Sequence, residues 1–182
     1  MLEIGIILGV LLLIITVIVV YNKLVKYKNL MQEAWSAIDV FLKKRHDVVP
    51  NLVEIVKGYA IHEKTMLEDI TRYRSEAMQR GDVASNVSAE NNLGKSLTNL
   101  FVTVEKYPDL KANTNFLQLQ QQLVDLEHDL ESARRYYNGT VRINNIYVEK
   151  FPSNIIAGMF NFPKGVFFAI DSSEKGVPQV SL

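Results

Sequence analysis

The sequence predicts an all-α protein in which an N-terminal transmembrane helix continues into an antiparallel four-helix bundle. Three observations support this prediction: an uncharged apolar run near the start of the 182-residue chain, apolar residues at spacings of three and four along most of the remainder, and one long heptad repeat. We expect a transmembrane anchor over residues 1–21, a helical bundle over 22–150 and an apolar tail over 151–182.

The composition excludes several classes of function. The 20 Lys and Arg residues balance the 20 Asp and Glu residues, and this argues against a nucleic-acid-binding protein, which normally carries a basic excess. The chain has no cysteine, so disulfides, cysteine-ligated metal sites and thiol nucleophiles are excluded.

The apolar run over residues 4–20 is interpreted as a membrane anchor. As a helix it would be about 26 Å long, close to the ~30 Å hydrocarbon core of a bilayer. A cleaved signal peptide would need a basic start and a small-residue cleavage site, but the one early charge is Glu3 and Tyr21-Asn22 follows the run. A buried core helix would show polar residues at helical spacing, and this run shows none.

The flanks of the anchor predict its orientation. Lys23, Lys26 and Lys28 follow the run, whereas no basic residue precedes it. The positive-inside rule therefore predicts an N-terminus outside and a cytoplasmic bundle. A periplasmic bundle is the alternative, because the rule is a statistical bias.

The first bundle helix should continue directly from the anchor, since no turn signal separates Val20 from Asn29. Pro50 should kink or divide this helix, because proline removes a hydrogen-bond donor and clashes with the preceding turn. The run Lys43-Lys44-Arg45 is interpreted as a solvated helix face. One face carries an apolar stripe, formed by Ala34, Ile38, Phe41, Leu42, Val48, Val49, Leu52, Ile55, Val56 and Tyr59.

Two shorter helices should follow. The second is expected over about 62–80, with Gly81 as its C-terminal cap, and a small, polar loop over 82–89. The third should begin near Ser88 and end before Tyr107-Pro108, because a residue that precedes proline disfavours the helical conformation.

The fourth helix has the clearest pattern. Asn113 or Thr114 can cap it, and Phe151-Pro152 should end it near Lys150. Two series at seven-residue spacing predict a continuous buried seam. They are Phe116, Leu123, Leu130 and Tyr137, and Leu119, Leu126, Ala133, Thr140 and Tyr147.

The tail is apolar over residues 155–170 and should form a short helix followed by an extended segment, with a frayed end from Asp171 onward. In an up-down bundle the fourth helix returns toward the membrane, so the tail would reach the bilayer surface. Phe160, Phe167 and Phe168 are the candidate membrane contacts. The tail could equally fold back over the bundle, and both alternatives stay open.

No pattern of an enzyme or metal site was found in the sequence. Asp125 and His128 have the spacing of one di-iron element, but the second element and the further carboxylates are missing. His62-Glu63 lacks the second histidine of a zinc protease, and no nucleophile elbow or phosphate-binding glycine loop is present. We therefore expect no catalytic residue, no metal, no cofactor and no small-molecule substrate.

An ordered set of motifs resembles the LemA family along nearly the whole chain. The resemblance implies a bacterial membrane protein, placed in the cell (inner) membrane, with one N-terminal span, an antiparallel helical bundle and no established catalytic activity. The motifs are Tyr21-Asn22, the run from Ala34 to Val40, Arg45, Pro50 to Val53, Tyr59, His62-Glu63, Tyr107 to Asn113, Phe116, Ala133 to Asn138, and Phe151-Pro152.

Two functions are weighed: a membrane-tethered scaffold that self-associates into homo-oligomers, and an adaptor or regulator that binds another membrane protein. The two long helices should form a stalk near the membrane that exposes apolar residues. Trp35, Ile38, Leu130 and Tyr137 are the candidate self-association residues. The apolar residues expected to be exposed are Leu24, Leu30, Met31, Trp35, Ile38, Leu130, Tyr137 and Ile143.

Overall fold

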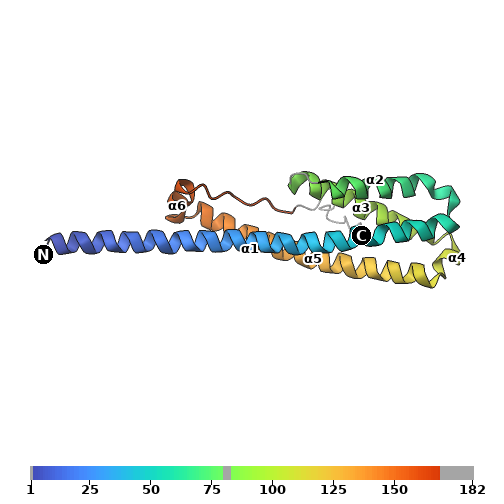
Figure 1. Ribbon diagram of the computed structural model, residues 1–182, viewed down its shortest axis with the longest axis horizontal. Helices are drawn as coiled ribbons and strands as arrows, with labels where there is room; N and C mark the ends of the chain where they lie inside the picture. The colour runs from blue at the N-terminus through green and yellow to red at the C-terminus, as the bar shows by residue number, and fades with distance from the viewer. Residues whose placement is uncertain (1, 80–82, 169–182) are drawn as a thin grey trace, which may run out of the picture. The chain divides into compact units, whose positions relative to one another are not determined.

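The computed structural model describes residues 2–79 and 83–168, with the side chains of residues 83–86 left out. No strand occurs in these described ranges, and Figure 1 shows the order of the helices. This confirms the predicted all-α fold class. The elements are α1 (Leu2–Tyr59), the 3-10 turn η1 (Ile61–Glu63), α2 (Lys64–Met78), α3 (Val83–Val104), α4 (Pro108–Lys111), α5 (Thr114–Glu149) and α6 (Ser153–Met159).

The chain forms two compact units, and α1 and α5 each contribute a segment to both. Of the described residues, unit 1 consists of 2–38 and 132–167, and unit 2 of 39–79, 83–131 and Phe168. The division of the chain into residues 1–21, 22–150 and 151–182 stays a prediction.

Unit 2 contains the four-helix arrangement that the apolar spacing predicts. Its core is built from α1, α2, α3 and α5, with Leu110 of α4 closing one end of the cluster. The helices α2 and α3 lie side by side (Figure 1). Burial of each large aliphatic side chain contributes on the order of 1.5–3 kcal/mol to stability. The most completely buried apolar members are Val49, Leu52, Val56, Ile70, Leu93, Leu100, Leu110 and Phe116.

Unit 1 holds the N-terminal part of α1 against the C-terminal part of α5 through aromatic contacts. The rings of Tyr27 and Tyr147 have centroids 4.5 Å apart, and those of Trp35 and Tyr137 are 5.2 Å apart in an edge-to-face arrangement. Such pairs are worth about 0.5–1.5 kcal/mol beyond the area that they bury. The aromatic residues of the predicted seam thus pack within the chain.

Helix α1 is continuous from the apolar run through Pro50, so the expected direct continuation is confirmed and the division at Pro50 is wrong. Pro50 has no N–H to donate to the carbonyl of His46, one turn earlier. Arg74 of α2 replaces it, because its Nε donates to that carbonyl at 2.7 Å. Within the described residues, α1 is the one helix long and apolar enough to cross a membrane.

Helix α3 begins at Val83, several residues before the expected start near Ser88, so the loop predicted over 82–89 is wrong for residues 83–89. The small, polar composition favoured a loop, but the additional turn places Val87 in a buried position, and packing overrides this weak propensity. Gly81, the predicted cap, lies outside the described residues. The predicted end of α3 before Tyr107-Pro108 is confirmed.

Two features lie around the start of α5. The short helix α4 was not predicted, and it begins with Pro108 at its first position, where a missing N–H is tolerated. Asn113 caps α5 as predicted, because its Oδ1 accepts a hydrogen bond from the N–H of Phe116 at 3.0 Å.

The tail forms the predicted short helix, α6, followed by an extended segment that folds back along α5. Asn145 fixes the backbone of Gly165 in both directions: its Oδ1 accepts from the Gly165 N–H at 2.7 Å, and its Nδ2 donates to the Gly165 carbonyl at 3.0 Å. The hydroxyl of Tyr137 donates to the carbonyl of Val166 at 2.8 Å. Residues 163–166 therefore follow the second alternative, in which the tail folds back over the bundle. The frayed end expected from residue 171 lies outside the described residues.

Candidate functional site

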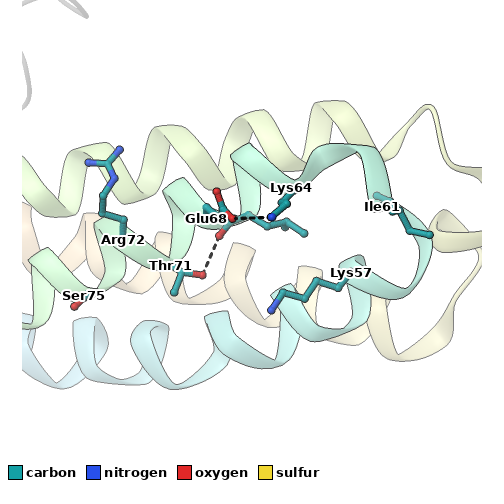
Figure 2. A pocket seen from close by; sticks show the side chains of 9 residues that line it. Lys57, Ile61, Lys64, Glu68, Thr71, Arg72 and Ser75 are labelled. Carbon is teal, nitrogen blue, oxygen red and sulfur yellow. Dashed lines mark hydrogen bonds and ion pairs between the residues drawn. The ribbon is translucent and has the colours of Figure 1, made fainter.

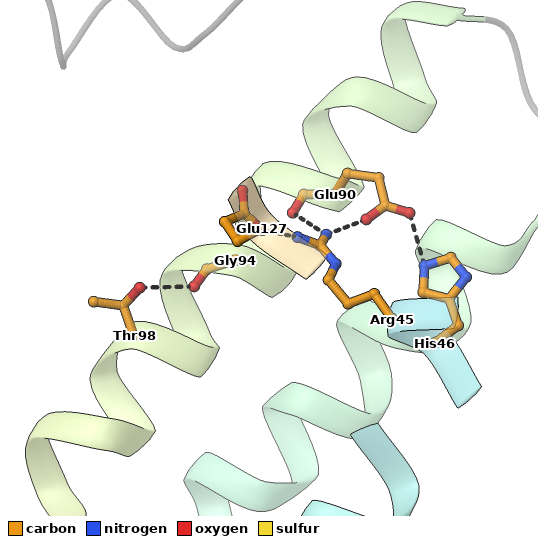
Figure 3. Close-up of polar contacts among 6 residues, drawn as sticks. All are labelled: Arg45, His46, Glu90, Gly94, Thr98 and Glu127. Carbon is orange, nitrogen blue, oxygen red and sulfur yellow. Dashed lines mark hydrogen bonds and ion pairs between the residues drawn. The ribbon is translucent and has the colours of Figure 1, made fainter. Parts of the chain in front are cut away.

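A buried polar cluster lies inside unit 2, and Figure 3 shows its side chains meeting between the helices. Arg45 of α1 and Glu90 of α3 are each 2% exposed and form an ion pair through Nη2 and Oε2. The same Nη2 donates to the backbone carbonyl of Glu90 at 3.1 Å, and Nη1 donates to Oε2 of Glu127 at 3.0 Å. One guanidinium thus connects three helices.

His46 completes the cluster on the other side of Glu90, with its Nε2 2.7 Å from Oε1 of the carboxylate. Burial alone would raise the pKa of Glu90, but the hydrogen bond with His46 and the charges of Arg45 and His46 together hold this pKa below its ordinary value. Glu90 is therefore a carboxylate at neutral pH.

The cluster connects helices and does not form an open reaction site. Arg45 and Glu90 are closed off from solvent, and Arg74 adds α2 to the same region through the His46 carbonyl. The buried ion pair constrains how α1 and α3 align, because an alignment that separates Arg45 from Glu90 leaves a buried charge without its partner. The arrangement supports a structural role for these residues.

The structure corrects the interpretation of Lys43-Lys44-Arg45 as a solvated face, because Arg45 is buried. A signal was present in the sequence. Arg45 lies seven residues after Ile38 and seven before Leu52, on the apolar stripe of α1. A charged residue at such a position predicts a buried partner, although it does not identify Glu90.

The expected exposure of the self-association candidates is wrong for most of them. Ile38, Leu130 and Tyr137 are buried, and Trp35 is half-buried against Tyr137. Burial also raises the pKa of Tyr137, so its hydroxyl stays protonated and donates to the tail. Of the other residues expected to be exposed, Leu24 is buried, Leu30 and Met31 are half-buried, and Ile143 is exposed.

The membrane-contact candidates also differ from one another. Phe160 and Phe167 are exposed, but Phe168 is buried and does not offer its ring to a bilayer. The ring of Phe160 contacts Tyr21, with centroids 4.9 Å apart.

An apolar outer stripe runs along α5 on a side of the helix next to the buried seam. It consists of Tyr136, Gly139, Ile143 and Ile146, at spacings of three, four and three, which is the spacing of one side of a helix–helix contact. The three large side chains are exposed, and Gly139 faces open space. Between residues 22 and 37, the exposed positions of α1 are polar except for Ala37. Ile143 is the one member of this stripe among the residues that the sequence predicts to be exposed.

A groove of about 740 Å³ lies beside the start of α2 (Figure 2). Its lining includes the apolar residues Ala60, Ile61 and Leu67. Lys64 pairs with Glu68 across 3.8 Å at its edge. The remaining lining residues are Lys57, Thr71, Arg72 and Ser75.

In the part of the chain that the structure describes, no three His, Asp or Glu side chains gather in a way that could hold a metal ion. His128 lies on the exposed side of α5, as expected from its position outside the seam.

The sequence model of the LemA family matches residues 34–182. Magnetosome protein MamQ 2 of Paramagnetospirillum magneticum is 22% identical over 188 residues, covering 89% of this chain and 69% of that protein. Protein LemA of Metamycoplasma hominis is 27% identical over 155 residues, covering 85% of this chain and 71% of that protein. Magnetosome protein MamQ of Magnetospirillum gryphiswaldense is 22% identical over 181 residues, covering 85% of this chain and 66% of that protein.

Proposed function

This chain belongs to the LemA family, and from that premise we propose that it is a non-catalytic, membrane-tethered scaffold that acts through lateral self-association. The outer stripe of α5 carries this proposal. The names of the relatives state no reaction, which is consistent with a structural role.

The outer stripe has the composition and spacing of a helix-pairing surface. Tyr136, Ile143 and Ile146 offer apolar area, and Gly139 between them lets a second backbone approach closely. Exposed apolar side chains at a/d spacing on a helix that already buries another of its sides indicate a further contact. We propose this stripe in place of Trp35, Ile38, Leu130 and Tyr137, because the last three are buried and Trp35 is half-buried against Tyr137.

A second copy of the chain is the proposed occupant. The apolar run of α1 anchors every copy in the same plane and in the same orientation, which raises the effective concentration of one stripe for another. Parallel copies also bring equivalent positions of α5 to the same height above the membrane.

The full-length protein in mild detergent tests self-association. Ile143→Glu and Gly139→Gln should each reduce the mass of the detergent-solubilised particle, because one adds a charge to the contact and the other fills the space in front of Gly139. Both positions face outward, so helical content should stay unchanged. Val102→Glu, at an exposed apolar position of α3, is the matched control and should leave the mass unchanged.

A wild-type protein that is monomeric both in detergent and by crosslinking in the membrane would overturn self-association. Equal losses of mass in all three variants would show that the effect is not specific to the outer stripe. Substitution of Tyr137 by Asp would not be informative, because this residue is buried and the variant would mainly test folding.

An adaptor that binds another membrane protein is the second candidate, and the groove at α2 favours it. Its apolar floor and the basic side chains at Lys57 and Lys64 suit an apolar segment of a partner with acidic flanks. Ile61→Glu should abolish capture of such a partner and leave the particle mass of the purified protein unchanged. An effect on mass instead would assign Ile61 to self-association.

We place the bundle on the cytoplasmic side of the bacterial inner membrane, because Lys23, Lys26 and Lys28 follow the span. A fluorescent protein fused after Leu182 should be bright, and an exported phosphatase fused there should be inactive. The opposite pair of results would place the bundle in the periplasm.

A further inference from the structure

Helix α6 packs against the end of the apolar run of α1. Its buried residues Ile156 and Ala157 form a small core with Leu24, and this core is extended by the partly buried Val17 and Val20. The rings of Phe160 and Phe162 both contact Tyr21, with centroids 4.9 and 5.6 Å away. These contacts fix α6 at the level where residues 4–20 leave the hydrocarbon core.

The opposite face of this region is apolar and exposed. Ile155 and Met159 lie four residues apart, on one side of α6, and are 55% and 72% exposed. Phe151, in the turn before the helix, is 74% exposed, and Phe160, just after it, is 51% exposed. Four large apolar side chains thus face outward beside the place where the span ends.

The charges around α6 fit a lipid surface. No charged residue occurs between Lys150 and Lys164, so the whole of α6 and both of its flanks are uncharged. Lys150, directly after the end of α5, precedes this uncharged region, and Lys23 lies on α1 next to Leu24, which packs against α6. Lysines in such positions extend to lipid headgroups while the apolar side chains enter the interface.

We propose that Phe151, Ile155, Met159 and Phe160 form a second membrane contact, with α6 lying in the interface of the bilayer beside the span. The occupant of this surface is lipid, because the surface is continuous with a helix segment of hydrocarbon-core composition. The contact would hold the C-terminal end of α5 at the membrane and restrict the tilt of unit 1. It does not depend on self-association.

Fluorescence of single tryptophans in the full-length protein tests this contact. Trp35 is the one native tryptophan, so Trp35→Phe provides the background and keeps an aromatic ring against Tyr137. Ile155→Trp and Met159→Trp are the probes. Ser36→Trp is the control, because Ser36 is exposed on α1 about 24 Å past the end of the apolar run and lies outside the outer stripe of α5.

The variants are reconstituted into vesicles of phosphatidylcholine and phosphatidylglycerol, with or without acyl chains that carry bromine. Both probes should emit at shorter wavelength than the control and lose most of their intensity in brominated lipid, while the control keeps its intensity. Emission at the wavelength of a hydrated indole with no bromine quenching would overturn the proposal. Short-wavelength emission without quenching would also overturn it, because a protein surface would then cover α6.

Discussion

Replacement of Glu90 by alanine is the most direct test of the buried polar cluster. The substitution removes the carboxylate that pairs with Arg45 and accepts from His46, both of which are buried. Arg45 keeps two acceptors, the Glu127 carboxylate at 3.0 Å and the backbone carbonyl of residue 90 at 3.1 Å. The guanidinium is therefore left partly, and not fully, uncompensated.

The size of the effect follows from this residual pairing. Removal of one partner from a buried ion pair costs about 3–5 kcal/mol, and the two remaining acceptors place Glu90→Ala near the lower end, at about 3 kcal/mol. The paired replacement Arg45→Met with Glu90→Leu should recover much of this loss, because it removes both charges and fills the same space. The cost arises from the unpaired charge rather than from the lost volume.

Urea unfolding of the full-length protein in mild detergent, followed by circular dichroism, measures these differences. Glu76→Ala is the control, because Glu76 forms an exposed ion pair with Arg72 along α2, at 3.2 Å. This control should change the unfolding midpoint very little. If Glu90→Ala lost no more stability than Glu76→Ala, or if the double replacement were worse than the single one, the cluster would not hold the helices together.

Three further predictions follow from the hydrogen bonds. Because the folded-state pKa of Glu90 is lowered, the ionised carboxylate contributes fully to the free energy of unfolding above about pH 4.3, the ordinary Glu pKa, and this contribution is lost as the pH falls toward the folded value. Glu90→Gln should therefore reduce the loss of stability at acid pH in urea titrations. The same acid loss in the variant and the wild type would contradict this prediction. Arg74→Met should lower the free energy of unfolding by about 1 kcal/mol in the wild-type chain. The loss should be smaller in a Pro50→Ala background, because the restored N–H of residue 50 then donates to the His46 carbonyl. Equal losses in both backgrounds would refute this account. Tyr137→Phe should increase amide hydrogen exchange in the tail over residues 163–166 while leaving exchange in α2 unchanged, and uniform exchange throughout would argue against a local role.

Much of the fold could be predicted because it rests on local patterns. The heptad residues Phe116, Leu123 and Leu130 fall on one side of a helix whatever surrounds them, and they are buried as predicted. Asn113 caps α5 through a contact three residues away. The apolar run of α1 is a matter of length and composition alone.

The start of α3 could not be predicted in the same way. The segment before Ser88 has a loop-like composition, and it is helical in a bundle where Val87 is buried. Helix propensity in such a segment is weak, so packing decides its conformation.

The sequence by itself determined the helical class, the long apolar start of α1 and the buried seam of α5, because periodicity and hydropathy act within each helix. Only the tertiary structure decided which polar groups pair: Glu90 with Arg45 across 45 positions of sequence, and Arg74 with the carbonyl that Pro50 leaves free. It also decided which apolar residues stay outside, since the tail covers Tyr137 and leaves Ile143 exposed. Pairing and coverage depend on distances between segments far apart in the chain, and no local pattern specifies those distances.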